Sequence, residues 1–259
     1  MKSKLPENSF KRGLHQGHVL FGLWTSLSGS YATEIMAGAG ADWLMLDTEH
    51  SPNELGDVLS QLQIVAAYDT SAVVRVPSNN VVAIKRFLDI GAQTLLIPQI
   101  DTADDARRAV AATRYPPNGV RGVGGTTRAT RFGRVADYAE RAHEELCVLV
   151  QIESQIALEN IEAIAAVPGV DGLFVGPADL HASCGYVGQL RHAEVVPKME
   201  AAIERIKAAG KPAGILSTGA ADDVALWLQH GAQFIAVGSD LGILVRGAEQ
   251  IIAVAKAVQ

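Results

Sequence analysis

The sequence predicts a (β/α)8 barrel of the α/β class, and three observations support this prediction. Short apolar runs alternate with longer amphipathic segments throughout the chain of 259 residues, which is the pattern of a parallel sheet buried on both faces. Eight such units match the size of a (β/α)8 barrel. An open doubly wound sheet usually has fewer strands and a glycine fingerprint after the first.

The eight apolar runs are expected to form the strands. Several are rich in β-branched residues, which favour a pleated and buried surface. In chain order they span residues 19–24, 43–47, 72–76, 94–98, 147–153, 171–176, 212–217 and 233–238.

The segments between these runs have helical periodicity. Several begin with an Asn or Thr cap and end with Gly, which are helix start and stop signals. Examples are NELGDVLSQLQIVAAY, NNVVAIKRFLDIG, TADDARRAVAATRY and KMEAAIERIKAAG.

No linker-like or low-complexity stretch divides the chain, so residues 1–259 are expected to form one domain. One connection, residues 115–145, is unusually long, and such loops are more often functional than idle. Two interpretations of its arginines stay open: a solvated flexible loop, or a lid or subunit contact that brings an arginine to a substrate carboxylate. These arginines are Arg121, Arg128, Arg131 and Arg134.

Composition excludes several classes of function. The net charge of -6 would attract neither nucleic acid nor an anionic membrane. Two cysteines without a metal-ligand spacing indicate neither a disulfide framework nor a zinc site. The N-terminus lacks an apolar signal segment, and no apolar run is long enough to span a membrane. We therefore expect a cytoplasmic protein.

Polar residues gather where the predicted strands end, and the carboxyl ends of barrel strands share one cavity. Arg75 is the strongest candidate for a functional residue among them, because a cation within an apolar strand needs an anion or carbonyl nearby. It is expected either to face a substrate or to form a structural ion pair with Asp47 or Glu49.

Glu153 and Asp179 follow successive strands, where two carboxylates would repel each other unless they shared a proton or a cation. A hard divalent ion such as Mg²⁺ or Mn²⁺ fits this pair. The alternative is that each carboxylate only caps a helix or turn.

His50 follows a strand end beside carboxylates, which is how a base is oriented. His181, two residues after Asp179, is a weaker candidate for the cavity. None of the eight lysines ends a strand, so a Schiff-base mechanism is not expected.

The sequence closely resembles the metal-dependent class II pyruvate aldolases of the HpcH/HpaI family, which includes 4-hydroxy-2-oxoheptanedioate and 2-dehydro-3-deoxyglucarate aldolases. The resemblance covers residues 15–255. Its motifs occur in the family's order: DTEH, VVRV, LDIGAQTLLIPQ, RYPPNGVRGVG, VQIES, VDGLFVGPADL and AVGSD.

The resemblance implies a role for individual residues. His50 would be the catalytic base, Asp89 the acid group that raises its basicity, and Arg75 the residue that stabilises an enolate. Glu153 and Asp179 would hold Mg²⁺, Mn²⁺ or Co²⁺, with Asp47 and Glu49 as supporting groups. Substrate contacts would come from Arg75, Gln151, Gly176, Pro177, Ala178 and Asp179.

The implied substrates are a 2-oxo acid, pyruvate or hydroxypyruvate, and an aldehyde. The resemblance also implies a hexamer, a trimer of dimers or dimer of trimers, with the last helix packed on a neighbouring subunit. Ala178 leaves the aldehyde preference open. Two rival functions remain: a lyase acting on an acyl-CoA ester such as malyl- or citryl-CoA, and a non-catalytic barrel that senses small acids.

Overall fold

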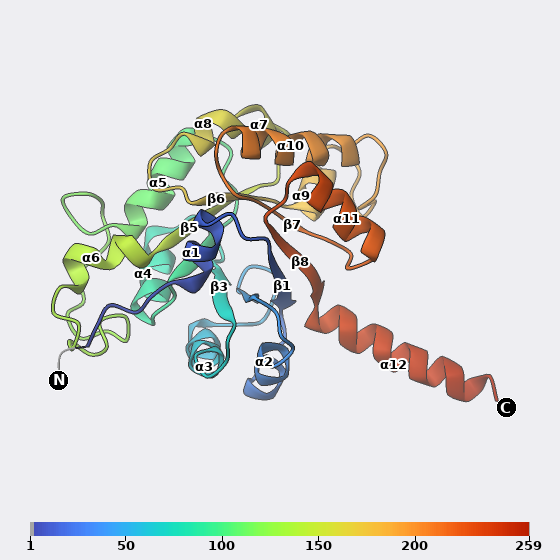
Figure 1. The fold of residues 1–259 in the computed structure, drawn as a ribbon, viewed down its shortest axis with the longest axis horizontal. Coiled ribbons are helices and arrows are strands. Elements are labelled where there is room, and N and C mark those ends of the chain that lie inside the picture. The colour runs from blue at the N-terminus through green and yellow to red at the C-terminus, as the bar shows by residue number, and fades with distance from the viewer. Residues whose placement is uncertain (1–2, 259) are drawn as a thin grey trace.

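The computed structural model describes residues 3–258 and contains a closed barrel of eight parallel strands in chain order (Figure 1). This confirms the predicted fold class, and each predicted strand lies within one residue of its observed bounds. Met1, Lys2 and Gln259 of the predicted domain lie outside the described residues. The strands are β1 Leu20–Thr25, β2 Trp43–Asp47, β3 Ser71–Arg75, β4 Thr94–Ile97, β5 Cys147–Ile152, β6 Gly172–Val175, β7 Ala213–Leu216 and β8 Phe234–Ser239.

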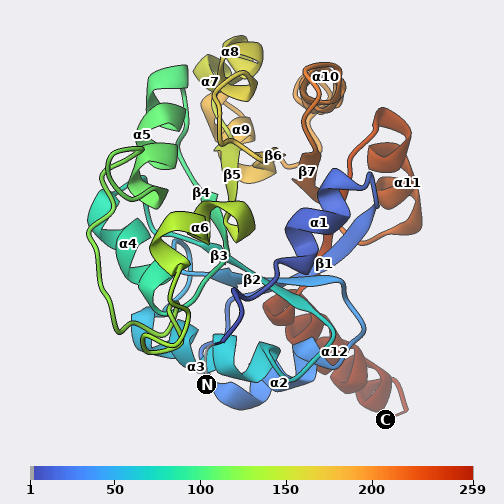
Figure 2. The ribbon, with the colours of Figure 1, turned by 60° about the vertical axis from the view of Figure 1, so that its left-hand side comes forward.

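Helices surround the barrel and connect its strands (Figure 2). Side-chain caps begin several of them; Thr102 and Asp105, for example, form a capping box at the start of α5. The helices are α1 Ser9–His15, α2 Ser30–Ala37, α3 Leu55–Val65, α4 Val81–Asp89, α5 Ala103–Thr113, α6 Tyr138–Glu145, α7 Gln155–Glu159, α8 Ile161–Ala165, α9 Pro177–Ser183, α10 Val196–Ala208, α11 Ala221–His230 and α12 Asp240–Lys256.

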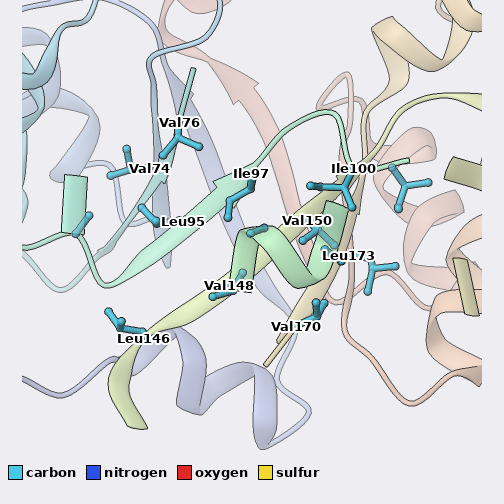
Figure 3. Packing of buried hydrophobic residues seen from close by; sticks show 14 of the residues in the cluster. Val74, Val76, Leu95, Ile97, Ile100, Leu146, Val148, Val150, Val170 and Leu173 are labelled. Carbon is cyan, nitrogen blue, oxygen red and sulfur yellow. The ribbon is translucent and has the colours of Figure 1, made fainter. Parts of the chain in front are cut away.

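Strand side chains alternate between two apolar cores. Outward residues such as Val74, Leu95 and Val148 pack beneath the helices (Figure 3). Inward residues, among them Trp43 and Phe234, fill the barrel. Because successive side chains point to opposite faces, a strand buried on both sides reads as a continuous apolar run.

The same alternation directs polar side chains to the carboxyl end of the barrel. On β2, Trp43 and Met45 point inward, so the next inward position is Asp47. On β3 the corresponding position is Arg75, which pairs in register with Asp47. The site is therefore the last inward layer of the barrel strands.

Two segments differ from a simple barrel. Residues 115–145 were expected to form one long connection, but their last part forms α6, whose Tyr138 and Ala142 are buried. Helix α12 extends away from the barrel instead of packing on it (Figures 1 and 2). Of its residues, only Asp240 is buried.

No helix within residues 3–258 combines the length and apolar character that crossing a membrane requires.

Candidate active site

The predicted catalytic rim encloses a cavity of about 220 Å³. A larger hollow, of about 630 Å³, lies at the opposite end of the barrel, where β3 and β4 begin, and none of the predicted site residues lines it. The smaller cavity is therefore the candidate active site. Its lining residues are Glu49, His50, Gln99, Asp101, Glu153, Ser154 and Asp179.

Arg75 is held rigidly beneath this cavity. Its Nε and one terminal nitrogen donate to the two oxygens of Asp47 at 2.8 and 2.7 Å. The other terminal nitrogen lies 3.0 Å from Glu49 Oε2, and the guanidinium lies 4.8 Å from the centre of the Trp24 ring. The predicted ion pair is confirmed with both acids. Glu49, which the second terminal nitrogen contacts, lines the cavity.

Asp47 supports the whole turn that carries the site. It also accepts hydrogen bonds from Trp24 Nε1 at 3.2 Å and from the Glu49 backbone at 3.0 Å. Burial alone would raise the pKa of Asp47, but the hydrogen bonds and charge of Arg75 outweigh burial and lower it. Asp47 is thus an ionised anchor for Arg75.

Glu49 behaves differently. Burial raises its pKa to about 7, the nearby charges of Asp47 and Asp179 add to the rise, and Arg75 opposes it. The charge of Arg75 does not offset burial, because Asp47, which is bound to its other two nitrogens, acts on Glu49 in the opposite sense. A cation near Glu49 would restore its charged form.

Glu153 is fixed by two amides. The Gln99 backbone donates to Oε1 at 2.7 Å, and the Gln151 side-chain amide donates to Oε2. Burial, together with the charges of Glu49 and Asp179, raises the pKa of Glu153 to about 7, although the Gln99 bond opposes this. The alternative in which Glu153 only caps the next helix is wrong, because Ser154 caps α7.

The segment 176–179 packs directly against Gln151 and Glu153. A Cβ on Gly176 would lie 2.7 Å from the Gln151 amide nitrogen and 3.0 Å from Glu153, so only glycine allows this close approach. Pro177, Ala178 and Asp179 form the first turn of α9, and Asp179 lines the cavity. The structure therefore brings the predicted substrate-contacting segment to the site.

His50 lies at the mouth of the cavity. Its side chain is 62 % exposed, and its Nε2 lies 4.0 Å from Glu49 Oε2. An imidazole in this position can accept a proton from a ligand in the cavity, because it combines access with a neighbouring carboxylate. The predicted base is therefore placed beside the predicted metal ligands.

The residues present fit a hard divalent ion. The cavity lining contains four carboxylates, and within residues 3–258 no lysine or arginine belongs to that lining. Across the same described range, no group of three or more His, Cys, Asp and Glu side chains is arranged to hold a metal. Mg²⁺ is nevertheless usually bound by only one or two protein carboxylates, and water and substrate fill its other coordination positions. Glu153 and Asp179 would supply these two carboxylates.

Asp89 does not reach this site. It is the last residue of α4 and precedes β4 by five positions, so it lies at the end of the barrel where strands begin. His50 follows the carboxyl end of β2. Strands of about five residues separate these ends by roughly 17 Å, and within one chain Asp89 pairs with Arg121 instead.

The arginines of the connection 115–145 also lie at the end of the barrel where the strands begin. Arg128 donates to the Ile90 carbonyl at 2.9 Å, and the Ala129 backbone donates to the Asp89 carbonyl at 3.1 Å. Arg131 and Arg134 line the larger hollow. None of these arginines therefore contributes to the cavity of its own chain.

Sequence reasoning missed three lining residues. Gln99 and Asp101 follow β4, and the rule that strand ends face the cavity could have identified them. Ser154 caps α7 and donates to Asp101. The weaker candidate, His181, is completely buried, and its Nδ1 lies 2.6 Å from the Pro177 carbonyl oxygen, away from the lining.

The chain is similar in sequence to known aldolases. A pyruvate aldolase from Rhizobium etli is 56% identical over 253 residues, covering 96% of this chain and 98% of that protein. A 4-hydroxy-2-oxo-heptane-1,7-dioate aldolase from Salmonella dublin is 50% identical over 248 residues, covering 95% of this chain and 94% of that one.

The fold is shared with solved relatives. A crystal structure of an aldolase/citrate lyase family protein from Burkholderia cenocepacia J2315 matches with a TM-score of 0.92 and 42% identity, over 96% of this chain and 99% of that one. The HpcH/HpaI aldolase/citrate lyase family matches residues 20–247. The chain, with its barrel and its polar rim, belongs to this family.

Proposed function

We propose that this protein is a class II aldolase that reversibly cleaves 4-hydroxy-2-oxo acids to pyruvate, or hydroxypyruvate, and an aldehyde. One observation carries the proposal: a guanidinium fixed by Asp47 stands beneath a cavity lined by His50, Glu153 and Asp179. A cation, a base and two metal-binding carboxylates are the groups that enolate chemistry needs. The names of the two aldolase relatives support the same reaction.

Glu153 and Asp179 would hold the metal ion, Mg²⁺, Mn²⁺ or Co²⁺. When bound, such an ion supplies Lewis acidity at the 2-oxo group of the substrate. The hydrogen bonds from Gln99 and Gln151 orient Glu153 for this role.

The chain's own residues move the protons and stabilise the charge. His50 accepts the proton of the C4 hydroxyl as the C3–C4 bond breaks, and the bonding electrons pass to the C2 carbonyl oxygen. Arg75 stabilises the oxygen of the resulting enolate with preorganised donors. A proton then returns from His50 to C3, which yields the 2-oxo acid; aldol addition follows the same steps in reverse.

Gln151 and the segment Gly176, Pro177, Ala178 and Asp179 would bind the 2-oxo acid. Close packing of Gly176 against Gln151 and Glu153 holds this segment beside Glu153, and Asp179 at its end lines the cavity. The small side chain of Ala178, which is exposed, would leave room for the aldehyde.

We further propose a cytoplasmic homo-oligomer, specifically a hexamer, built from one-domain chains. Helix α12 exposes a long series of apolar side chains, and contiguous exposed apolar surface marks an interaction site. Phe21 on the outer face of β1 and Ile35 on α2 are also exposed, at 37% and 71%, so a neighbour's helix has an apolar surface to cover. The exposed α12 residues are Leu241, Ile243, Leu244, Val245, Ile251, Ile252 and Val254.

Assembly would also give Asp89 a role. Because Asp89 and His50 lie at opposite ends of one barrel, Asp89 can support a His50 only in a second copy. We therefore assign Asp89 to the catalytic group of the neighbouring subunit.

A substrate comparison tests the proposed reaction. With Mg²⁺, Mn²⁺ or Co²⁺ present, the protein is expected to release pyruvate from free 4-hydroxy-2-oxo acids and to exchange deuterium into the methyl group of pyruvate. Release from malyl- or citryl-CoA alone would instead support the acyl-CoA lyase. Binding of oxamate without exchange would support a sensor, and either result would overturn the proposal.

Subunit mixing tests the position of Asp89. His50→Ala and Asp89→Ala are each expected to be inactive, whereas co-refolding equal amounts should restore about a quarter of wild-type activity through random pairing. Mixing His50→Ala with Arg75→Ala is the matched control and should restore nothing, because both groups belong to the same chain's cavity. Failure of the first mixture to recover activity would place Asp89 outside the neighbour's site.

A further inference from the structure

Arg121 is a charged side chain enclosed by aromatic rings. It has no exposed surface, and its guanidinium carbon lies 4.5 Å from the centre of the Tyr115 ring and 5.8 Å from that of Tyr138. The two rings pack edge to face, with centroids 6.4 Å apart. Burying a guanidinium costs desolvation free energy unless the group is paired. The cation–π contacts with the two rings offset only part of that cost.

Asp89 is the carboxylate that pairs with this guanidinium. A terminal nitrogen of Arg121 donates to Asp89 Oδ1 at 2.8 Å. Its Nε and its other terminal nitrogen have no hydrogen-bond partner within residues 3–258. The position of Asp89 is therefore coupled to a buried guanidinium whose other side-chain neighbours include Tyr115 and Tyr138.

Asp89 itself is placed against the electrostatics of its helix. It is the last residue of α4, where the negative end of the helix dipole disfavours a carboxylate. Its side chain remains 24 % exposed, and its Oδ2 accepts no hydrogen bond from the described part of the chain. The pair with Arg121 offsets this electrostatic cost and occupies one carboxylate oxygen, so the other oxygen is available for a further contact.

The backbone fixes both partners. The Arg121 amide donates to the Arg114 carbonyl at 2.9 Å, and the Asp89 carbonyl accepts from Ala129 at 3.1 Å. Burial alone would lower the pKa of Arg121, but Tyr138 and Asp89 outweigh burial and raise it. The Arg121 guanidinium is therefore charged, and the backbone of both residues is held in place.

We propose that Arg121 is a positioning residue for the aldol reaction: packed against the rings of Tyr115 and Tyr138, it fixes one oxygen of Asp89 and leaves the other to contact a second copy of this chain. This inference rests on the proposed function and on the assignment of Asp89 to a neighbour's His50. It extends that assignment by naming the device that holds Asp89 in place.

A double-mutant cycle on the full-length oligomer tests the inference. Arg121→Met is expected to lower kcat about 100-fold, the effect of a misplaced catalytic group, with little change in KM for the 2-oxo acid. In an Asp89→Asn background the same substitution should cause no further loss, because Arg121 acts through Asp89. A purely structural arginine would lower kcat by the same factor in both backgrounds, which would overturn the inference.

Arg114→Met is the matched control. Arg114 directly follows α5 and precedes the connection that carries Arg121, and its terminal nitrogen donates to Thr113 rather than to Asp89. Its loss is expected to lower stability without a selective loss of kcat. If Arg121→Met does not fold, Tyr138→Leu is the second variant, because it removes one ring and keeps the ion pair. Its loss of kcat should be smaller and should likewise vanish in the Asp89→Asn background. Persistence of that loss would contradict the inference.

The outcomes separate this inference from the proposed function. Wild-type activity in Asp89→Asn would remove the role of Asp89, and Arg121 would lose its function with it. A slow Asp89→Asn combined with a fully active Arg121→Met would overturn the positioning role alone. Absence of pyruvate exchange in the wild-type protein would overturn the proposed reaction itself.

Discussion

Replacement of Arg75 by alanine is expected to lower kcat for pyruvate proton exchange by about two to three orders of magnitude, the usual cost of removing a preorganised donor to an oxyanion. The affinity for the metal should change far less, because Arg75 contacts Asp47 and Glu49 and neither predicted metal ligand. Exchange measured by NMR and metal affinity measured by calorimetry provide the two readouts.

The variant also leaves Asp47 buried without its partner, which costs about 3–5 kcal/mol of stability. Chemical unfolding must therefore accompany the kinetics. Arg75→Lys is the matched variant, since it keeps the charge and loses the two-pronged contact with Asp47. We expect its rate to lie between those of wild type and Arg75→Ala. A folded Arg75→Ala protein with an unchanged rate would refute the enolate role.

The barrel could be predicted because one physical rule governs all of its strands. Parallel strands covered on both faces must be apolar at every position, so runs such as Trp43-Leu-Met-Leu46 mark a strand. The transition to Asp47 marks the carboxyl end of β2, and the same reasoning located Arg75, Glu153 and Asp179. The predicted ends of the strands therefore also indicated where the site residues lie.

The groups that were missed or left open depend on contacts that no periodicity encodes. Gln99, whose φ is 57°, contributes its backbone N–H, and every residue type except proline has this donor. Asp89 lies at the end of a helix, as the helical segment NNVVAIKRFLDIG predicted, but its partner Arg121 is 32 positions away, beyond β4 and α5. Long-range pairs of this kind follow from tertiary packing, which local sequence patterns do not specify.

The orientation of α12 illustrates a different limit. Its sequence is apolar and amphipathic, which is compatible with packing on its own barrel or on another. The structure shows the helix extended from β8 with its apolar residues exposed (Figure 1). The choice depends on whether α12 makes more favourable contacts with its own barrel or with another one. The sequence of the helix alone does not specify those contacts.

Removal of the metal is expected to abolish turnover, and addition of Mg²⁺, Mn²⁺ or Co²⁺ should restore it. Glu153→Gln should weaken metal affinity by about 100-fold or more, since loss of even a supporting contact costs 10- to 100-fold. Asp101→Asn is the matched control: Asp101 lines the same cavity but accepts from Ser154, so its loss should leave metal affinity nearly unchanged. Full activity in chelator-stripped protein would exclude the metal from the reaction.

Stripping should also change how stability depends on pH. In the metal-free protein the pKa values of Glu49 and Glu153 are raised to about 7 from an ordinary 4.5. The folded state therefore binds more protons than the unfolded state between these values, so the free energy of unfolding falls as pH rises from about 4.5 through about 7. Without metal, Glu153→Gln should then be more stable than wild type at pH 8, by on the order of 2 kcal/mol, and the advantage should vanish near pH 4.

Urea titrations of the two stripped proteins at both pH values measure this difference directly. Addition of Mn²⁺ at pH 8 should stabilise wild type and leave Glu153→Gln almost unaffected, because only the wild-type carboxylate pair can bind the ion. The stability test is independent of turnover. The prediction would be wrong if the stripped wild-type protein gained stability relative to Glu153→Gln as pH rose. Glu49 and Glu153 would then bind no more protons in the folded state than in the unfolded state, and a metal would have no protons to displace.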